Sequence, residues 1–208
     1  MKKSFIWALI FLAMLVLNGN KAHAEEKKDR FKASLLSLVI PGLGQYYVGS
    51  SAYAKIFITI ELALWSSYYY NSTMMDASRQ DYFSQASLHA GVNPSGFGTS
   101  YLNAVGAYNS SYDHNMRKMQ LSVNPVLYSG NQSWTWDKEA NRLLFRNLRE
   151  RELDYENNIK FCIAGMVLNH FVSALHASKL VQQKDKSYSM VRINVIHRGI
   201  ATTYIRSF

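Results

Sequence analysis

Residues 35–49 read LLSLVIPGLGQYYVG, a largely apolar stretch that contains one proline and three glycines. Pro41 removes a backbone donor from the middle of the stretch, and Gly42 and Gly44 lower its helical preference. The sequence therefore predicts a helix over about 33–48 that is interrupted at Pro41. The interruption makes this helix either kinked and spanning, or re-entrant, so that it leaves a membrane on the side where it entered.

The stretch belongs to a longer apolar region with few charges. Between Ala33 and Tyr70, only Lys55 and Glu61 are charged. At about 38 residues the region is too long for one membrane span of about 20 residues, and it suits two helices joined by a turn. We therefore expect a second apolar helix over about 53–70. It ends in aromatic residues suited to a membrane–water boundary: Trp65, Tyr68, Tyr69 and Tyr70.

A third apolar segment covers residues 159–181 and follows a run of mixed charge. Asp137 is suited to cap a helix, and the sequence predicts one long helix from there into the apolar segment. The polar segment between the second and third apolar helices, 71–158, is then extramembrane. We expect it to contain two helices, over about 74–90 and 98–119.

The first 24 residues have the pattern of a signal peptide. Two lysines precede an apolar core of about 13 residues, which is shorter than a membrane span, and Ala22 and Ala24 are the small residues of a cleavage site. We expect cleavage after Ala24, which leaves Glu25 as the first residue of an exported protein. An uncleaved anchor helix is the alternative.

The tail, residues 182–208, is basic. Alternating residues followed by a turn predict a short β-hairpin there. The positive-inside rule places the tail in the cytoplasm, because Asp185 is its only acidic residue against five basic ones: Lys184, Lys186, Arg192, Arg198 and Arg206. Cleavage of the leader would leave Glu25 outside. Three crossings would then place 71–158 outside and the tail in the cytoplasm. The leader and the basic tail therefore agree only if the Pro41 helix crosses fully.

Composition excludes several classes of function. The net charge of +9 falls to about +6 without the leader, and no run of like charges indicates nucleic-acid binding. The only cysteine, Cys162, excludes an intramolecular disulfide and a cysteine metal cage. His89, His114 and His197 lack the spacing of a zinc site, and no serine-hydrolase motif is present. We therefore predict no catalytic residue, metal or cofactor.

Polar residues inside the apolar helices are the first candidate site. Glu61 lies near the middle of the second apolar helix, where a carboxylate normally requires a partner. In the third, Asn169, Ser173 and His176 fall at i, i+4 and i+7 on one face, with His170 beside them. We predict that Glu61 contacts this stripe, either as a structural hydrogen bond or as part of a proton or ion path.

The chain resembles a bacterial domain-of-unknown-function family of small, signal-peptide-bearing envelope membrane proteins. The family's motif corresponds to Pro41, Gly42, Leu43, Gly44, Gln45 and Tyr46, followed by a glutamate at Glu61. Further matches extend the resemblance over about 33–181: residues 89–92, Trp134 with Trp136, Asn169-His170 and Ser173-Ala174. The resemblance implies a location and an architecture but no reaction.

Two further groups of residues are candidates for contacts. Small residues let helices approach closely in lipid, so the motif is predicted to serve packing, with close approach to a ligand as the alternative. Its residues are Pro41, Gly42, Gly44, Gln45 and Tyr46. The pair Trp134 and Trp136 is predicted either to pack within the protein or to form a stacking platform for a partner.

These observations predict a mainly α, non-enzymatic integral membrane protein of the bacterial envelope, with a helical membrane domain over 25–181. Its expected partners are membrane lipid and another envelope protein or a second copy of itself, without nucleic acid. The alternative is a small transporter or channel-like component that uses Glu61 and the stripe. The inner membrane is the expected location, whereas the alternating tail ending in Phe208 leaves the outer membrane as an alternative.

Overall fold

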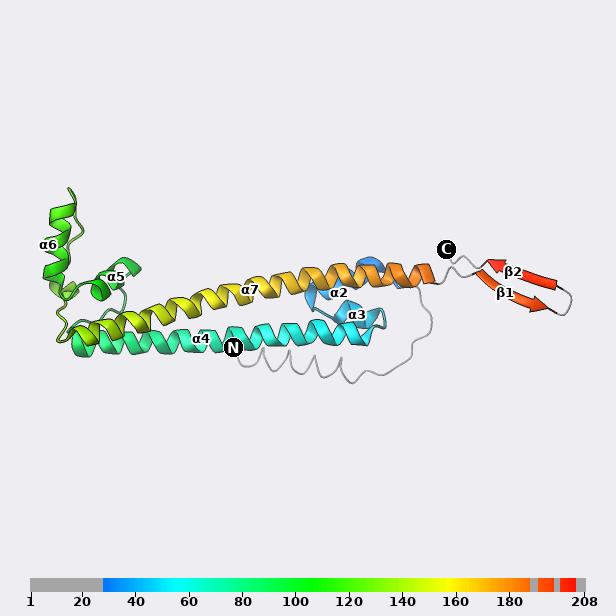
Figure 1. Ribbon diagram of the computed structural model, residues 1–208, viewed down its shortest axis with the longest axis horizontal. Helices are drawn as coiled ribbons and strands as arrows, with labels where there is room; N and C mark the ends of the chain where they lie inside the picture. Colours follow the sequence, from blue (N-terminus) through cyan, green and yellow to red (C-terminus); the bar gives the residue numbers. More distant parts are fainter. Residues whose placement is uncertain (1–27, 188–190, 197–198, 205–208) are drawn as a thin grey trace. The chain divides into compact units, whose positions relative to one another are not determined.

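A computed structural model describes residues 28–187, 191–196 and 199–204 (Figure 1). The predicted leader, 1–24, lies outside the described residues. The protein is mainly α, as predicted. In chain order the elements are α2 (Arg30–Val39), α3 (Leu43–Tyr47), α4 (Ser51–His89), α5 (Thr99–Ala107), α6 (Ser111–Leu121), a 3₁₀ turn η1 (Gly130–Gln132), α7 (Glu139–Ser187), β1 (Val191–Ile196) and β2 (Gly199–Tyr204).

The chain divides into two compact units. Unit 1 contains the residues up to Ser66 and those from Cys162 onward, and unit 2 is Ser67–Phe161. Unit 1 is therefore discontinuous in sequence. Both long helices, α4 and α7, contribute residues to each unit.

The first apolar stretch forms a helical hairpin and not a single helix over 33–48. Asp29 caps α2 by accepting hydrogen bonds from the N–H groups of Phe31 and Lys32. The chain reverses at Gly42, whose φ of 98° is readily available only to glycine. The backbone N–H of Asp29 donates to the Tyr47 hydroxyl at 3.3 Å, which brings the start of α2 to the end of α3. The hairpin has the chain reversal that the re-entrant alternative requires, and its place in a membrane stays a prediction.

Helix α4 is longer than predicted. Separate helices over about 53–70 and 74–90 were expected, but one helix of 39 residues covers both. The polar residues at the expected break bond to carbonyls one turn earlier and so continue the helix: Asn71 donates to the Ser67 carbonyl at 2.7 Å, and Thr73 to that of Tyr69 at 3.0 Å.

The predicted helix over 98–119 is two helices. Tyr108 is extended at the end of α5, and Ser110 begins α6 by accepting a hydrogen bond from the N–H of Asp113 at 3.1 Å. Ser110 also pairs with Thr135 in an isolated β-bridge. This pairing and the serine cap stabilise an extended backbone between the helices.

Helix α7 confirms the predicted long helix that ends in the third apolar segment. It has 49 residues and begins two residues after Asp137. The Asp137 carboxylate accepts a hydrogen bond from the Asn141 amide at 2.8 Å and lies 2.9 Å from Nδ1 of His89. These two contacts hold the pKa of Asp137 below its ordinary value. Three spanning helices were expected. Among the described residues, only α7 is long and apolar enough to cross a membrane.

Unit 2 has an aromatic core. Tyr101 lies edge-on to Tyr128 and Trp134, and Phe145 packs against Tyr82 and Trp136. Both indole N–H groups are satisfied, because Trp134 donates to the Tyr108 carbonyl and Trp136 to that of Val105. Unit 2 therefore has a core of its own.

The two short strands lie in the basic tail, where the sequence predicted a hairpin. They pair antiparallel, with Val191 opposite Tyr204 and Ile196 opposite Gly199. The two residues between the strands lie outside the described part of the chain.

Candidate functional site

The motif glycines bring the α2–α3 hairpin against α4 and α7. A Cβ at Gly42 would lie 2.6 Å from the Ala54 carbonyl oxygen, and one at Gly44 would overlap the Ala33 carbonyl oxygen. The Gly42 N–H donates to the Ser173 hydroxyl at 2.9 Å. The motif thus serves close packing, one of its two predicted roles.

Gln45 is the centre of a buried polar network. It is 0% exposed. Its amide oxygen accepts from the hydroxyls of Ser37 at 2.8 Å and Ser173 at 3.2 Å, and its amide nitrogen donates to the Ser173 carbonyl at 2.8 Å. The same nitrogen lies 3.4 Å from Nδ1 of His176. A single amide therefore joins α2 and α3 to two residues of the α7 stripe.

Glu61 contacts the other end of the stripe, which confirms the predicted contact. Asn169 donates to one carboxylate oxygen at 2.9 Å and also to the Phe57 carbonyl at 3.2 Å. The second oxygen accepts from the Trp65 indole at 2.9 Å. These donors provide partners for both oxygens of a carboxylate that is only 9% exposed.

His170 joins Glu61 to the hairpin. Its Nδ1 lies 2.6 Å from the Leu38 carbonyl oxygen, and its Nε2 lies 3.5 Å from a Glu61 oxygen. A carbonyl only accepts hydrogen bonds, so Nδ1 carries a proton. Nε2 then faces the Glu61 carboxylate.

The stripe therefore divides its contacts. Asn169 and His170 bind Glu61, whereas Ser173 and His176 contact the motif side of the site. The His176 ring also lies 4.6 Å from the ring centre of Tyr53 and 5.5 Å from that of Phe57. Tyr46 is half-buried on α3.

Sequence reasoning missed two members of the network. Ser37 donates to Gln45 and accepts from the Gly44 N–H at 2.9 Å. Ser34 donates to the Ala174 carbonyl at 3.2 Å. The signal was present, because the two serines are three residues apart on α2, which ends two residues before the motif's proline.

Of the two roles predicted for Trp134 and Trp136, the structure shows packing within the protein. Trp134 is 2% exposed and Trp136 is 6% exposed. Both rings lie in the core of unit 2 and so present no stacking surface to a partner.

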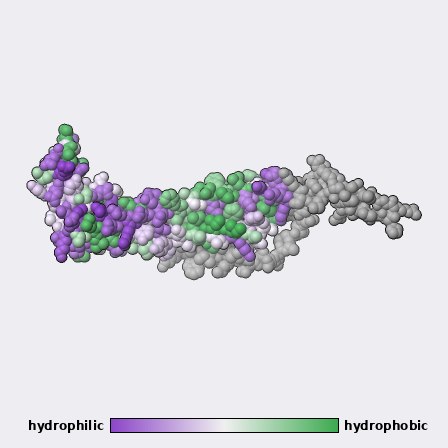
Figure 2. Space-filling model, viewed as in Figure 1, coloured by the Kyte–Doolittle hydropathy of each residue, from purple (hydrophilic) through white to green (hydrophobic). Residues whose placement is uncertain are grey.

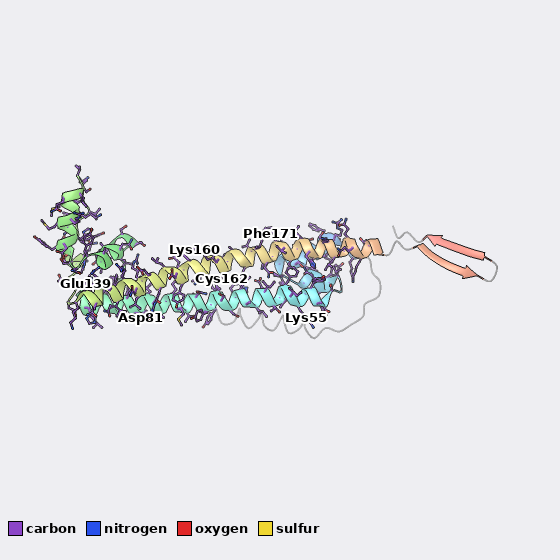
Figure 3. All side chains as sticks on the ribbon, viewed as in Figure 1. Lys55, Asp81, Glu139, Lys160, Cys162 and Phe171 are labelled. Carbon is purple, nitrogen blue, oxygen red and sulfur yellow. The ribbon has the colours of Figure 1, made fainter. Side chains whose placement is uncertain are left out.

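Apolar side chains surround the network on the outside of unit 1. Phe171 is 57% exposed and points away from α4 (Figure 3). Figure 2 shows hydrophobic residues gathered over this part of α7 and α2. The exposed apolar residues are Phe31, Leu35, Leu38 and Val39 on α2, Tyr53, Ile56 and Ile60 on α4, and Ile163, Val167, Leu168, Phe171, Val172 and Leu175 on α7. We call this set the apolar belt.

Within the residues that the structure describes, no group of three or more His, Cys, Asp or Glu side chains could hold a metal ion. Comparison of the chain with models of protein families, with curated proteins and with solved structures finds no match. The geometry of unit 1 is therefore the basis for a functional proposal.

Proposed function

We propose that this chain is a non-enzymatic integral membrane protein of the bacterial envelope. In this proposal unit 1 lies in the bilayer, and unit 2 binds a partner or supports envelope structure outside it. The supporting observation is the inverted distribution of polarity in unit 1. Gln45, Ser37 and Ser173 are 0% exposed, whereas Leu175 and Val39 are more than 70% exposed.

Water and lipid favour opposite distributions. In water, an apolar belt of this size is unfavourable by about 25 cal/mol for each Å² exposed, whereas lipid removes this cost. Buried polar side chains that hydrogen-bond between helices are typical of proteins in membranes, where lipid does not satisfy polar groups. The distribution in unit 1 therefore favours a lipid environment.

The first test is membrane separation on a density gradient, followed by washing at alkaline pH. We expect the chain in washed membranes of inner-membrane density, at the size expected after loss of residues 1–24. Release by the wash would contradict the proposal, and outer-membrane density would contradict the location.

The rival proposal, a proton-linked transport component, is supported by one specific contact. Glu61 faces Nε2 of His170 at 3.5 Å, inside a unit whose exterior is apolar. The test compares Glu61→Gln, which keeps the shape and hydrogen-bonding capacity, with Leu64→Met as a packing control on the same helix. If Glu61→Gln folds normally and cells keep the wild-type phenotype, the scaffold proposal stands. A folded Glu61→Gln variant that reproduces the deletion phenotype would support transport.

A further inference from the structure

Three lysines from separate segments meet at one end of unit 1. The Nζ atoms of Lys28 and Lys32 lie 4.9 and 5.2 Å from the ring centre of Tyr47. The Nζ of Lys184, from α7, donates to the Val48 carbonyl at 2.7 Å. Because Tyr47 and Val48 are adjacent, the three ammonium groups gather around the end of α3. We call them the lysine cluster.

The charge of the lysine cluster is not neutralised by nearby carboxylates. No salt bridge joins any of the three to an acidic side chain between residues 28 and 187. Two acidic residues are adjacent to the cluster in sequence. Asp29, next to Lys28, uses its carboxylate to cap α2, and Asp185, next to Lys184, forms no salt bridge with the three lysines. Each ammonium has three donors, and Lys184 uses one of them on the Val48 carbonyl. The cluster therefore keeps donors and positive charge for an anion.

The lysine cluster adjoins the apolar belt. Phe31, which lies between two of the lysines in sequence, is 70% exposed, and Leu35 follows one turn later. Lysines and tyrosines beside an exposed apolar surface are typical of the membrane–water boundary, where long side chains extend toward the headgroups. An anion that reaches this cluster from lipid is attached to acyl chains that contact the belt.

We propose that the lysine cluster is a binding site for the phosphate of an anionic phospholipid, with the acyl chains of that lipid against α2. This inference rests on the proposed membrane function and adds a class of ligand to it. Each lysine near an anionic membrane surface strengthens binding by about fivefold. Replacing all three lysines is therefore expected to weaken binding by about a hundredfold.

The test measures the thermal stability of the purified full-length protein in neutral detergent with added lipid. A ligand that binds the folded state raises the melting temperature in proportion to the logarithm of its concentration over Kd. We expect phosphatidylglycerol to raise it well above the effect of phosphatidylcholine. Glycerol 3-phosphate, which is the headgroup without acyl chains, is expected to have little effect.

The variant replaces Lys28, Lys32 and Lys184 with glutamine, and we expect it to lose the extra stabilisation by phosphatidylglycerol. The matched control replaces three exposed lysines of unit 2, Lys118, Lys138 and Lys160, which changes the net charge equally. Replacing the cluster with three arginines, which retain the charge, is expected to restore the effect.

Four outcomes would overturn the inference: no preference of the wild-type protein for phosphatidylglycerol, an equal effect of glycerol 3-phosphate, an equal loss in the unit 2 control, or an unchanged preference in the cluster variant. A folding defect is recognised by a lowered melting temperature without lipid, and the arginine variant then decides. A separate measurement tests the membrane proposal: the wild-type protein in neutral phosphatidylcholine vesicles is washed at alkaline pH. Release of the protein would contradict the membrane proposal and, with it, the inference of a lipid site.

Discussion

Gly44 lies where its neighbours leave no room for a side chain. A Cβ there would overlap the Ala33 carbonyl and the Ser37 hydroxyl, and would lie 2.9 Å from the Cβ of Ala177. We expect Gly44→Ala to lower the free energy of unfolding by about 1–3 kcal/mol, because overpacking displaces helices that are already in contact. Denaturant titration of the purified protein measures the change.

Gly106→Ala is the matched control for this prediction. Gly106 is buried in α5, but a Cβ there would meet the nearest atom, on Phe145, at an ordinary 3.4 Å. Alanine is the better helix former by about 0.5–1 kcal/mol, so we expect little change or a small gain. Equal losses at both glycines would show that the close approach at Gly44 is unimportant.

Asn169 is expected to be energetically coupled to Glu61. Asn169→Leu keeps the size of the side chain but removes the donor to the buried carboxylate, so we expect a loss of stability of about 1–3 kcal/mol. Adding Glu61→Leu removes the unpaired charge and is expected to recover part of the loss. A double-mutant cycle measures the coupling, and strictly additive effects would contradict it.

Tyr101 makes unit 2 sensitive to alkaline pH. Its hydroxyl donates to the Gln132 carbonyl at 3.0 Å, and burial raises its pKa to about 12. The ordinary pKa of about 10 applies to the unfolded chain, so folding favours the neutral phenol. This stabilising contribution is fully present below pH of about 10 and is lost as the pH rises toward about 12.

The measurement follows unfolding and phenolate absorbance of the protein between pH 9 and about 12.5, a range set by the ordinary and raised pKa values. Tyr101→Phe is expected to be less stable at neutral pH by about 1 kcal/mol, because it lacks the hydrogen bond. It is also expected to lose less stability at alkaline pH. Parallel pH curves for the two proteins would refute the assignment to Tyr101.

A contact between residues could be predicted only where the chemistry of one side chain required a particular kind of partner. The Glu61–Asn169 contact followed from the sequence, because a carboxylate in an apolar helix needs a donor and α7 offers a polar face. The bonds of Gln45 to Ser37 and Ser173 did not follow. They depend on how α2 and α3 fold back on each other, which the spacing of residues along the chain does not determine.

A helix was predicted correctly where the sequence pattern that indicates it was uninterrupted. The continuous α7 followed from a long stretch without proline. The continuity of α4 was missed because polar residues 71–73 resemble a boundary in sequence, although their side chains bond within the helix. The division between α5 and α6 was missed because it depends on Ser110 pairing with Thr135, 25 residues away in sequence.

Helix α6 is the element of unit 2 that we expect to meet a partner. Tyr112, Met116 and Met119 fall at i, i+4 and i+7 and are 70%, 39% and 51% exposed. Such a stripe is typical of a helix that binds a protein groove. A photo-crosslinking amino acid in place of Tyr112 is therefore expected to capture an envelope protein or a second copy in cells.

Asp81 is the control position, since it is exposed on α4 away from this stripe in sequence. Crosslinking there at the same yield would show that the product at Tyr112 is not specific to α6. No product at Tyr112 would refute α6 as the partner-binding surface.

If unit 1 lies in the bilayer as proposed, the hairpin leaves two crossings, by α7 and by the unit 1 part of α4. The start of α2 and the end of α7 then share one side, because Asp29 contacts Tyr47 and Lys184 contacts Val48. The positive-inside rule and an outward mature N-terminus consequently cannot both hold. We expect cysteines at Lys28 and Lys184, in a Cys162→Ala background, to be labelled by an impermeant thiol reagent from the same side.

A cysteine at Lys138, in unit 2, is expected to be labelled from the opposite side. Comparison of intact cells with permeabilised cells assigns the sides and shows which of the two orientation cues fails. Labelling of positions 28 and 184 from different sides would contradict the re-entrant hairpin in the membrane.

The discontinuity of unit 1 has a consequence for synthesis on the ribosome. Glu61 is made 108 residues before Asn169, and Gln45 is made 128 residues before Ser173. At about 5–20 residues per second, both early side chains wait on the order of ten seconds for their partners. The whole of unit 2 is translated during that interval, so unit 2 is the first part of the nascent chain able to complete its fold. The α2–α3 hairpin lacks its α7 contacts until translation of α7 is complete, and we expect it to reach its final packing last.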